Sequence, residues 1–162
     1  MQFDHHVFDV WAFQRTPRGV RYLLLYTSVE KAQRHFNGGR FWQIPSGVVG
    51  EHESVTGAVQ RQLSSYGLTA SSIWAAELVY VIYNRRFDTM QAIAVYAAEV
   101  DDAPIHLNPA EHAEHAWLTL EECLARVHYR GLKDGIRSVH EYVTGTETPA
   151  PELCLYPSSG SR

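Results

Sequence analysis

A glycine-containing loop followed directly by an amphipathic helix is the feature that most constrains the fold of this chain. Residues 47–53 contain two glycines and no hydrophobic periodicity, which predicts a loop. Ser54 is a suitable N-cap for a following helix, and Gly67 is well placed to end it. Three apolar residues recur on one helical face, namely Val55, Val59 and Leu63. The sequence therefore predicts one central helix that buries a single apolar stripe.

Segments on both sides of this helix have the composition of strands. Residues 7–13 and 20–26 predict a hairpin, and residues 41–44 predict a short strand that ends at Pro45. Residues 73–83 and 90–100 are rich in β-branched and aromatic residues and predict a longer hairpin. In the first strand, alternation places four residues on one side: Val7, Asp9, Trp11 and Phe13. Strands before and after a central helix indicate an α/β protein with a mixed sheet.

The C-terminal third predicts two helices and a tail. Thr119 and Glu122 have capping-box spacing, so a helix is expected over residues 120–128. A second helix is expected over residues 132–143. We expect a single domain over residues 1–145, followed by a loose proline-containing tail over residues 146–162.

Composition excludes several classes of protein. The chain has 162 residues and a net charge of −4, which disfavours nucleic acid as a partner. The longest apolar run, residues 92–98, is too short to cross a membrane, which needs roughly 20 residues. Two cysteines, Cys123 and Cys154, make no disulfide framework and favour a cytoplasmic protein. A homodimer is an alternative that nothing in the sequence decides.

Residues 42–68 carry the most specific motif of the chain, WQIPSGVVGEHESVTGAVQRQLSSYGL. The stretch resembles the Nudix box of phosphoanhydride hydrolases, G-x5-E-x7-R-E-U-x-E-E-x-G-U, where U is a bulky aliphatic residue. Four residues match at the family spacing, Gly47, Glu53, Arg61 and Leu63, and residues 67–68 match if one residue is deleted before them. Element order extends the resemblance to residues 3–143. It implies the Nudix fold, an α/β (α+β) protein with an α-β-α sandwich around a mixed sheet, and Mg²⁺ or Mn²⁺ if the chain is active.

The box departs from the family at the positions that bind metal. The family's metal-binding glutamates correspond to Gln62, Ser65 and either Tyr66 or the deleted residue, and residues 54–76 contain no Asp or Glu. Magnesium prefers carboxylate oxygens, and neutral side chains do not offset its charge. Loss of about 4 kcal/mol of transition-state stabilisation slows a reaction roughly a thousandfold. We therefore expect metal-dependent hydrolysis to be badly impaired, and we expect Tyr66 to fill the vacated space.

The residues that shape the loop and helix are retained. The resemblance implies an ion pair between Glu53 and Arg61 that holds the loop against the helix, with Gly47 and Leu63 completing this scaffold. A polar loop over residues 28–40 precedes the box and is expected near the pocket. With Arg61, two of its cations are candidate phosphate-binding residues, Arg34 and Arg40, and Lys31 and His35 lie in the same loop.

A second motif, residues 111–117, keeps an enzymatic alternative open. EHAEHAW resembles the Glu-His followed by Trp in Nudix pyrophosphohydrolases for dihydroneopterin triphosphate and dATP. The resemblance makes Glu111 a candidate general base, and Glu53, Glu111 and Glu114 a candidate reduced metal site. We interpret the neighbouring histidines, His112 and His115, as surface residues, because their spacing is not that of a zinc peptidase.

Three functions follow from these patterns. The first is a Nudix-fold protein that binds a nucleoside-diphosphate-type or pterin phosphate ligand, with hydrolysis weak or absent. The second is an active pyrophosphohydrolase that uses the reduced metal site. The third is a regulatory domain that binds protein. Enzymatic activity is left undecided by the sequence, because a fold does not carry its chemistry once the site has changed.

Overall fold

The computed structural model describes residues 1–158 and places eight strands in one mixed sheet. The strands are β1 (Gln2–Thr16), β2 (Gly19–Thr27), β3 (Trp42–Gln43), β4 (Ser46–Val48), β5 (Ala70–Asn84), β6 (Thr89–Val100), β7 (His112–Leu118) and β8 (Cys154–Tyr156). Their order is β3-β2-β1-β6-β5-β8, while β4 pairs with β1 and β7 pairs with β2. The β1–β6 pair is parallel and the two predicted hairpins, β1–β2 and β5–β6, are antiparallel.

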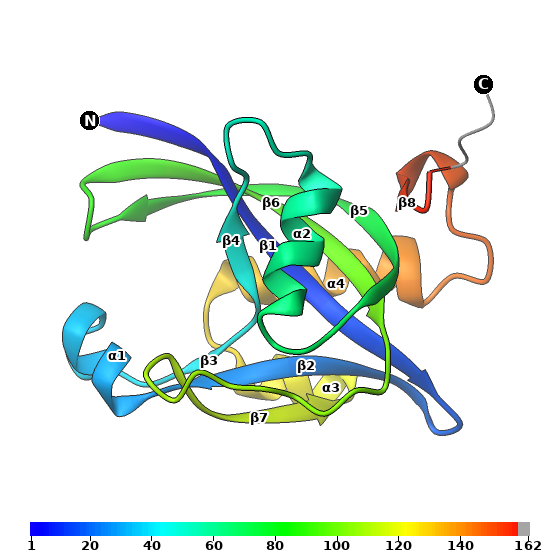
Figure 1. The fold of residues 1–162 in the computed structure, drawn as a ribbon, viewed down its shortest axis with the longest axis horizontal. Helices are drawn as coiled ribbons and strands as arrows, with labels where there is room; N and C mark the ends of the chain where they lie inside the picture. Colours follow the sequence, from blue (N-terminus) through cyan, green and yellow to red (C-terminus); the bar gives the residue numbers. More distant parts are fainter. Residues whose placement is uncertain (159–162) are drawn as a thin grey trace.

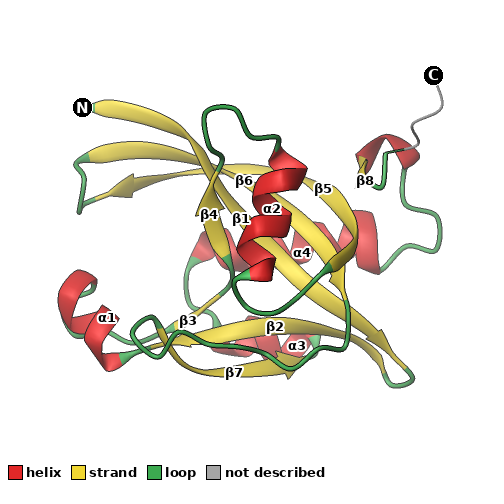
Figure 2. Ribbon diagram, in the orientation of Figure 1, coloured by secondary structure: helices red, strands yellow, loops and turns green. Residues whose placement is uncertain are grey.

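Helices cover both faces of this sheet (Figure 1). They are α1 (Val29–His35), α2 (Val55–Ser64), α3 (Leu120–Arg126) and α4 (Arg130–Val139), followed by a π-helical turn (His140–Thr144) and a 3-10 turn (Pro151–Leu153). Figure 2 shows α2 in front of the sheet, with α3 and α4 behind it. The predicted α-β-α sandwich is confirmed. No helix of residues 1–158 combines the length and apolarity needed to cross a membrane.

Alternation along β1 divides its side chains between two cores. Phe8 and Val10 are buried with α2 residues such as Leu63 on one face. Trp11 is buried with residues of α3 and α4, including Ile136, on the other face. Each residue of β1 therefore contributes to one face only, because successive side chains of a strand point to opposite faces.

The central loop and helix form as their sequence predicts. The Ser54 hydroxyl accepts a hydrogen bond from the Gly57 amide at 3.0 Å, which caps α2. Gly67 adopts φ +79° after the helix, where a Cβ atom would also lie 2.5 Å from the His106 ring. The predicted capping box of Thr119 and Glu122 is present at the start of α3.

The segment predicted as a polar loop contains α1. The Ser28 hydroxyl caps this helix by accepting from the Lys31 amide at 3.0 Å, and it also donates to the Ala110 carbonyl at 2.8 Å. Ala32 is the one buried residue of α1. The sequence of α1 has almost no apolar periodicity, and its polar composition is typical of a loop, so the helix was not predicted.

The C-terminal segment also differs from the loose tail that the sequence predicts. Strand β8 pairs with the edge of β5, where Ile73 lies opposite Tyr156. Leu153 is buried just before β8. The free backbone groups at the edge of β5 offer hydrogen bonds that local sequence does not reveal. The last part of the predicted tail, residues 159–162, lies outside the described residues.

Candidate functional site

Two cavities adjoin each other across the segment that joins β3 to β4. Gln43, Ile44 and Ser46 line both of them. The polar cavity has a volume of about 350 Å³ and lies on the α2 side of this segment. The aromatic cavity has a volume of about 580 Å³ and lies against the start of α4. The three shared residues therefore form a common wall between a polar and an aromatic compartment.

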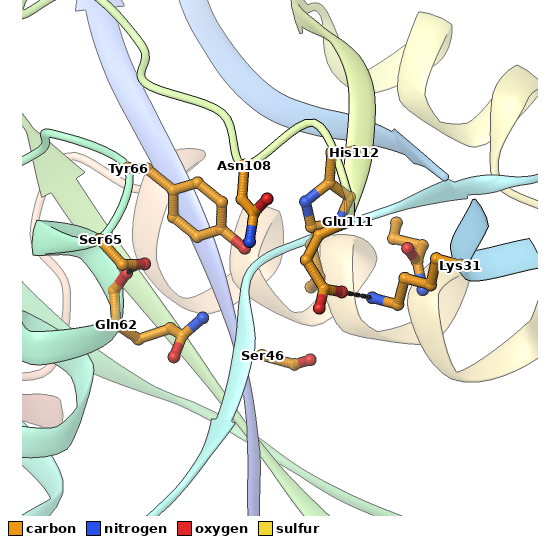
Figure 3. A pocket seen from close by; sticks show the side chains of 10 residues that line it. Lys31, Ser46, Gln62, Ser65, Tyr66, Asn108, Glu111 and His112 are labelled. Atoms are coloured by element: carbon orange, nitrogen blue, oxygen red, sulfur yellow. Dashed lines mark hydrogen bonds and ion pairs between the residues drawn. The ribbon is translucent and has the colours of Figure 1, made fainter. Parts of the chain in front are cut away.

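Side chains from four separate parts of the chain meet in the polar cavity (Figure 3). Besides the common wall, its lining consists of Lys31, Gln62, Ser65, Tyr66, Asn108, Glu111 and His112. Figure 3 shows Gln62, Ser65 and Tyr66, at and just after the end of α2, on one side of the cavity, with Glu111, His112 and Lys31 on the other. The lining is made mostly of neutral hydrogen-bonding groups.

Lys31 and Glu111 form an ion pair at the edge of the polar cavity, with 3.2 Å between Nζ and Oε2. Helix α1 supplies the lysine, and Ser28 ties the start of this helix to the loop before β7 through its amide and the Glu111 carbonyl. Lys31 is the more buried partner, with 20% of its side chain exposed against 43% for Glu111. This arrangement holds one ammonium group beside the cavity.

The sequence analysis predicts His112 as a surface residue, and this prediction is wrong. His112 is buried and lines the polar cavity. Its residue is 6% exposed, and its Nδ1 atom has no hydrogen-bond partner within residues 1–158. Burial lowers the pKa of His112 to about 4, and the positive charge of Lys31 acts in the same direction. The imidazole is therefore neutral at pH 7.

The residues that correspond to the metal-binding positions of the Nudix box lie at and just after the end of α2 and offer no negative charge: Gln62, Ser65 and Tyr66. The Ser65 hydroxyl donates back to the Gln62 carbonyl at 2.6 Å. Tyr66 is buried at the end of α2, and burial raises the pKa of its hydroxyl. Gly47 allows a close approach of this region, because a Cβ atom there would lie 3.1 Å from Gln62 Oε1 and 3.0 Å from Phe8.

Glu53 and Arg61 form the ion pair that the Nudix resemblance implies. Arg61 donates to both carboxylate oxygens of Glu53, at 2.8 and 2.9 Å, and to the Val48 carbonyl at 2.8 Å. The Gly50 amide donates to the same carboxylate at 3.0 Å. Hydrogen bonds from Arg61 and Gly50 lower the pKa of Glu53 to about 2. Both side chains are engaged in holding the loop to α2.

The structure does not gather the candidate metal ligands Glu53, Glu111 and Glu114. Glu53 pairs with Arg61, Glu111 lines the polar cavity, and Glu114 lies opposite Tyr26 within β7. Residues 1–158 contain no group of three His, Cys, Asp or Glu side chains placed to hold a metal ion. Pairing of β7 with β2 fixes Glu114 in a strand instead of a loop. The residues present therefore do not fit a carboxylate-bound magnesium site.

The arginines predicted to contact phosphate are engaged elsewhere. Arg34 pairs with Glu30 on α1. Arg40 donates to the Thr27 carbonyl at 2.9 Å and lies over the Tyr26 ring, 4.6 Å from its centroid. Neither arginine lines the polar or the aromatic cavity, and Arg61 does not line them either. Lys31 is the cation of the predicted loop that reaches the polar cavity.

Sequence reasoning did not single out several residues that line the cavities, notably Asn108, Ser46 and Asp9. Asn108 and Ser46 carry no periodic or motif signal in their loops. Asp9 does carry one, because it is a carboxylate on an otherwise apolar side of β1. A charged residue on a buried strand face is rare unless it is paired or functional.

Known proteins resemble this chain in structure but not detectably in sequence. No protein-family model matches the sequence. No similar sequence is found among curated proteins either. Residues covering 90% of this chain superpose on 98% of a Nudix hydrolase from Listeria monocytogenes, with a TM-score of 0.72 and 14% identity.

Two further solved structures are similar. The Nudix domain of NrtR from Shewanella oneidensis, complexed with ADP ribose, has a TM-score of 0.65 and 17% identity over 87% of each chain. The dihydroneopterin triphosphate pyrophosphohydrolase of E. coli has a TM-score of 0.61 and 15% identity over 88% of this chain and 99% of its own. The chain therefore has the Nudix fold, as the box resemblance implied.

Proposed function

We propose that this protein binds a phosphorylated small molecule of nucleoside-diphosphate or pterin phosphate type, and hydrolyses it weakly or not at all. The phosphate groups occupy the polar cavity. The observation that carries this proposal is the lining of that cavity. Of the described residues that line it, Glu111 alone has a carboxylate, and the ion pair with Lys31 offsets the charge of that carboxylate. A site of this kind accepts an anion without first binding a dication.

The polar groups around Lys31 suit phosphate oxygens. Gln62 and Asn108 carry amide N–H donors, and Ser46 carries a hydroxyl. A lysine ammonium beside such donors forms charge-assisted hydrogen bonds with phosphate, which are roughly twice as strong as neutral ones. The likeness to a Nudix domain that binds ADP ribose supports a nucleotide-type ligand. The net charge of −4 favours a small ligand over nucleic acid.

Weak hydrolysis follows from the same residues. The candidate metal site has three carboxylates, and only that of Glu111 lines the polar cavity. The described residues contain no group of three His, Cys, Asp or Glu side chains that could hold a metal ion. A hydrolase would need a metal or an equivalent charge to stabilise the developing negative charge at phosphorus. The active pyrophosphohydrolase is the alternative, with Glu111 as its general base.

Calorimetric titration with ADP ribose, ADP and dihydroneopterin triphosphate tests the proposal, in parallel with Mg²⁺ and with a chelator. We expect at least one of these ligands to bind, with the same affinity in the presence of Mg²⁺ as in the presence of the chelator. Lys31→Met is expected to weaken binding about tenfold by removing a charge-assisted hydrogen bond. Glu111→Gln is expected to maintain or strengthen it, because the ligand no longer meets a negative charge. Lys133→Ala, on α4 outside both cavities, is the matched control and is expected to bind as the native protein does.

The opposite pattern identifies the alternative function. Binding that requires Mg²⁺, together with phosphate release that Glu111→Gln abolishes, would assign an active hydrolase. Absence of binding by all three ligands in the folded protein would reject the proposed function.

A further inference from the structure

The aromatic cavity contains a buried carboxylate that the polar cavity and its proposed phosphate ligand do not use. Asp9 is 6% exposed and lines this cavity near the centre of β1. It lies on the same side of β1 as Trp11, and its strand partner in β6 is Val95. Burying a charged side chain is unfavourable unless hydrogen bonds compensate. The surroundings of Asp9 therefore need an explanation.

Tyr80 satisfies one of the two oxygens of Asp9. Its hydroxyl donates to Asp9 Oδ2 across the intervening strand β6. The other oxygen, Oδ1, takes no part in this hydrogen bond and belongs to a side chain that lines the cavity. A carboxylate has about four acceptor positions, so this oxygen remains available to a donor that enters the cavity.

Aromatic side chains form much of the wall around Asp9 in this cavity. Phe41, Tyr80, Tyr83 and Tyr129 line it, and the Phe41 and Tyr129 rings meet edge to face with 5.0 Å between centroids. Gly131 at the start of α4 lets the Tyr80 ring lie beneath the helix, because a Cβ atom there would be 2.2 Å from the ring. Flat apolar walls of this kind suit a planar ring that stacks or meets an aromatic edge.

We propose that the aromatic cavity binds the nitrogen heterocycle of the ligand and that Asp9 selects heterocycles with an N–H donor, such as an amino group. This inference rests on the proposed function, in which the same ligand places its phosphates in the polar cavity across the common wall. Asp9 Oδ1 accepts the heterocycle's N–H while Tyr80 holds Oδ2. A ring without a donor leaves the buried carboxylate unpaired and binds more weakly.

Three diphosphates test this selection at pH 7.5: ADP, GDP and purine riboside 5′-diphosphate, whose base has no N–H donor. We expect ADP or GDP to bind at least tenfold more tightly than the purine riboside compound, as the loss of a hydrogen bond to a charged acceptor requires. In Asp9→Asn this ratio is expected to fall severalfold. Asp102→Asn is the matched control, because it removes an exposed carboxylate that lines neither cavity.

Two further probes separate this inference from the proposed function. Inorganic pyrophosphate tests the polar cavity alone, and its affinity is expected to be unchanged in Asp9→Asn. The nucleosides adenosine, guanosine and purine riboside test the aromatic cavity alone. If pyrophosphate fails to bind but adenosine or guanosine still outbinds purine riboside through Asp9, the proposed function fails and the heterocycle site stands. Equal affinities for all three bases, or a ratio that Asp9→Asn leaves intact, overturn the heterocycle site.

Discussion

The two cavities on either side of the β3–β4 segment bury ionisable groups of opposite type, a base in the polar cavity and an acid in the aromatic cavity. In the polar cavity a basic group, His112, is buried beside Lys31, and its pKa is lowered to about 4. In the aromatic cavity an acidic group, Asp9, is buried beside Tyr80, and its pKa is raised to about 6. Burial is the main cause in both cases, because it disfavours the charged form of either group. The same physical effect therefore gives the two compartments opposite dependences on pH.

The largest expected effect concerns Asp9 and sharpens this contrast. The folded state retains the Asp9 proton between pH 3.8 and about 6, whereas the unfolded chain loses it, so native stability falls as pH rises through this window. Asp9→Asn removes this ionisation. We expect its stability relative to the native protein to improve by up to about 3 kcal/mol between pH 4 and pH 7, measured by urea unfolding. A difference that does not vary with pH would show that Asp9 titrates as an ordinary carboxyl group.

A substitution at Gly131 is expected to break the aromatic cavity while leaving the polar one intact. A Cβ atom at this position would overlap the Tyr80 ring. Gly131→Ala is expected to cost about 2 kcal/mol of stability through overpacking. In a Tyr80→Ala background the same change is expected to cost much less, so a double-mutant cycle measures the clash. Additive costs would place the strain elsewhere.

The corresponding test in the polar cavity uses His112. His112→Leu removes a buried nitrogen that has no partner within residues 1–158, so we expect a gain of about 1 kcal/mol at pH 7. Because the lowered pKa of His112 costs native stability as pH falls from 6.5 to about 4, the gain is expected to grow over that range. Thermal unfolding at several pH values measures it. A loss of stability would mean that Nδ1 has a partner in solution.

The smallest expected effect serves as a reference outside both cavities. In Arg61→Ala the pKa of Glu53 is expected to rise from about 2 toward its ordinary value of 4.5, because the principal hydrogen-bond donor is gone. Titration followed by NMR measures this pKa directly. Any stabilisation from the pair is present above pH 4.5 and disappears as pH falls toward 2. Affinity for ADP is expected to change little, since neither residue lines a cavity.

Elements with strong local signals were predictable. The caps at Ser54 and Thr119 and the apolar stripe of α2 require only neighbouring residues, and they form as expected. Helix α1 was missed because it is seven residues long and buries Ala32 alone. Strand β8 was missed because its pairing partner, β5, lies about 80 residues earlier in the chain.

The candidate site was less predictable than the fold. The sequence identified the carboxylate-poor face of α2 and the presence of Glu111, but it did not predict that His112 is buried. It also favoured arginines that the structure engages in other contacts. Local spacing does not determine whether a charged side chain finds a nearer partner than a ligand.

By itself the sequence determined the two hairpins, the loop and helix that resemble the Nudix box, and the absence of Asp and Glu over residues 54–76, because each of these depends on residue types at short spacing. Only the tertiary structure decided which distant groups share a compartment. The Lys31–Glu111 ion pair joins residues 80 positions apart, and the Asp9–Tyr80 hydrogen bond joins residues 71 positions apart. Pairing of strands and packing of helices create these contacts, and the resulting burial, which no local pattern encodes, sets the pKa values of Asp9 and His112.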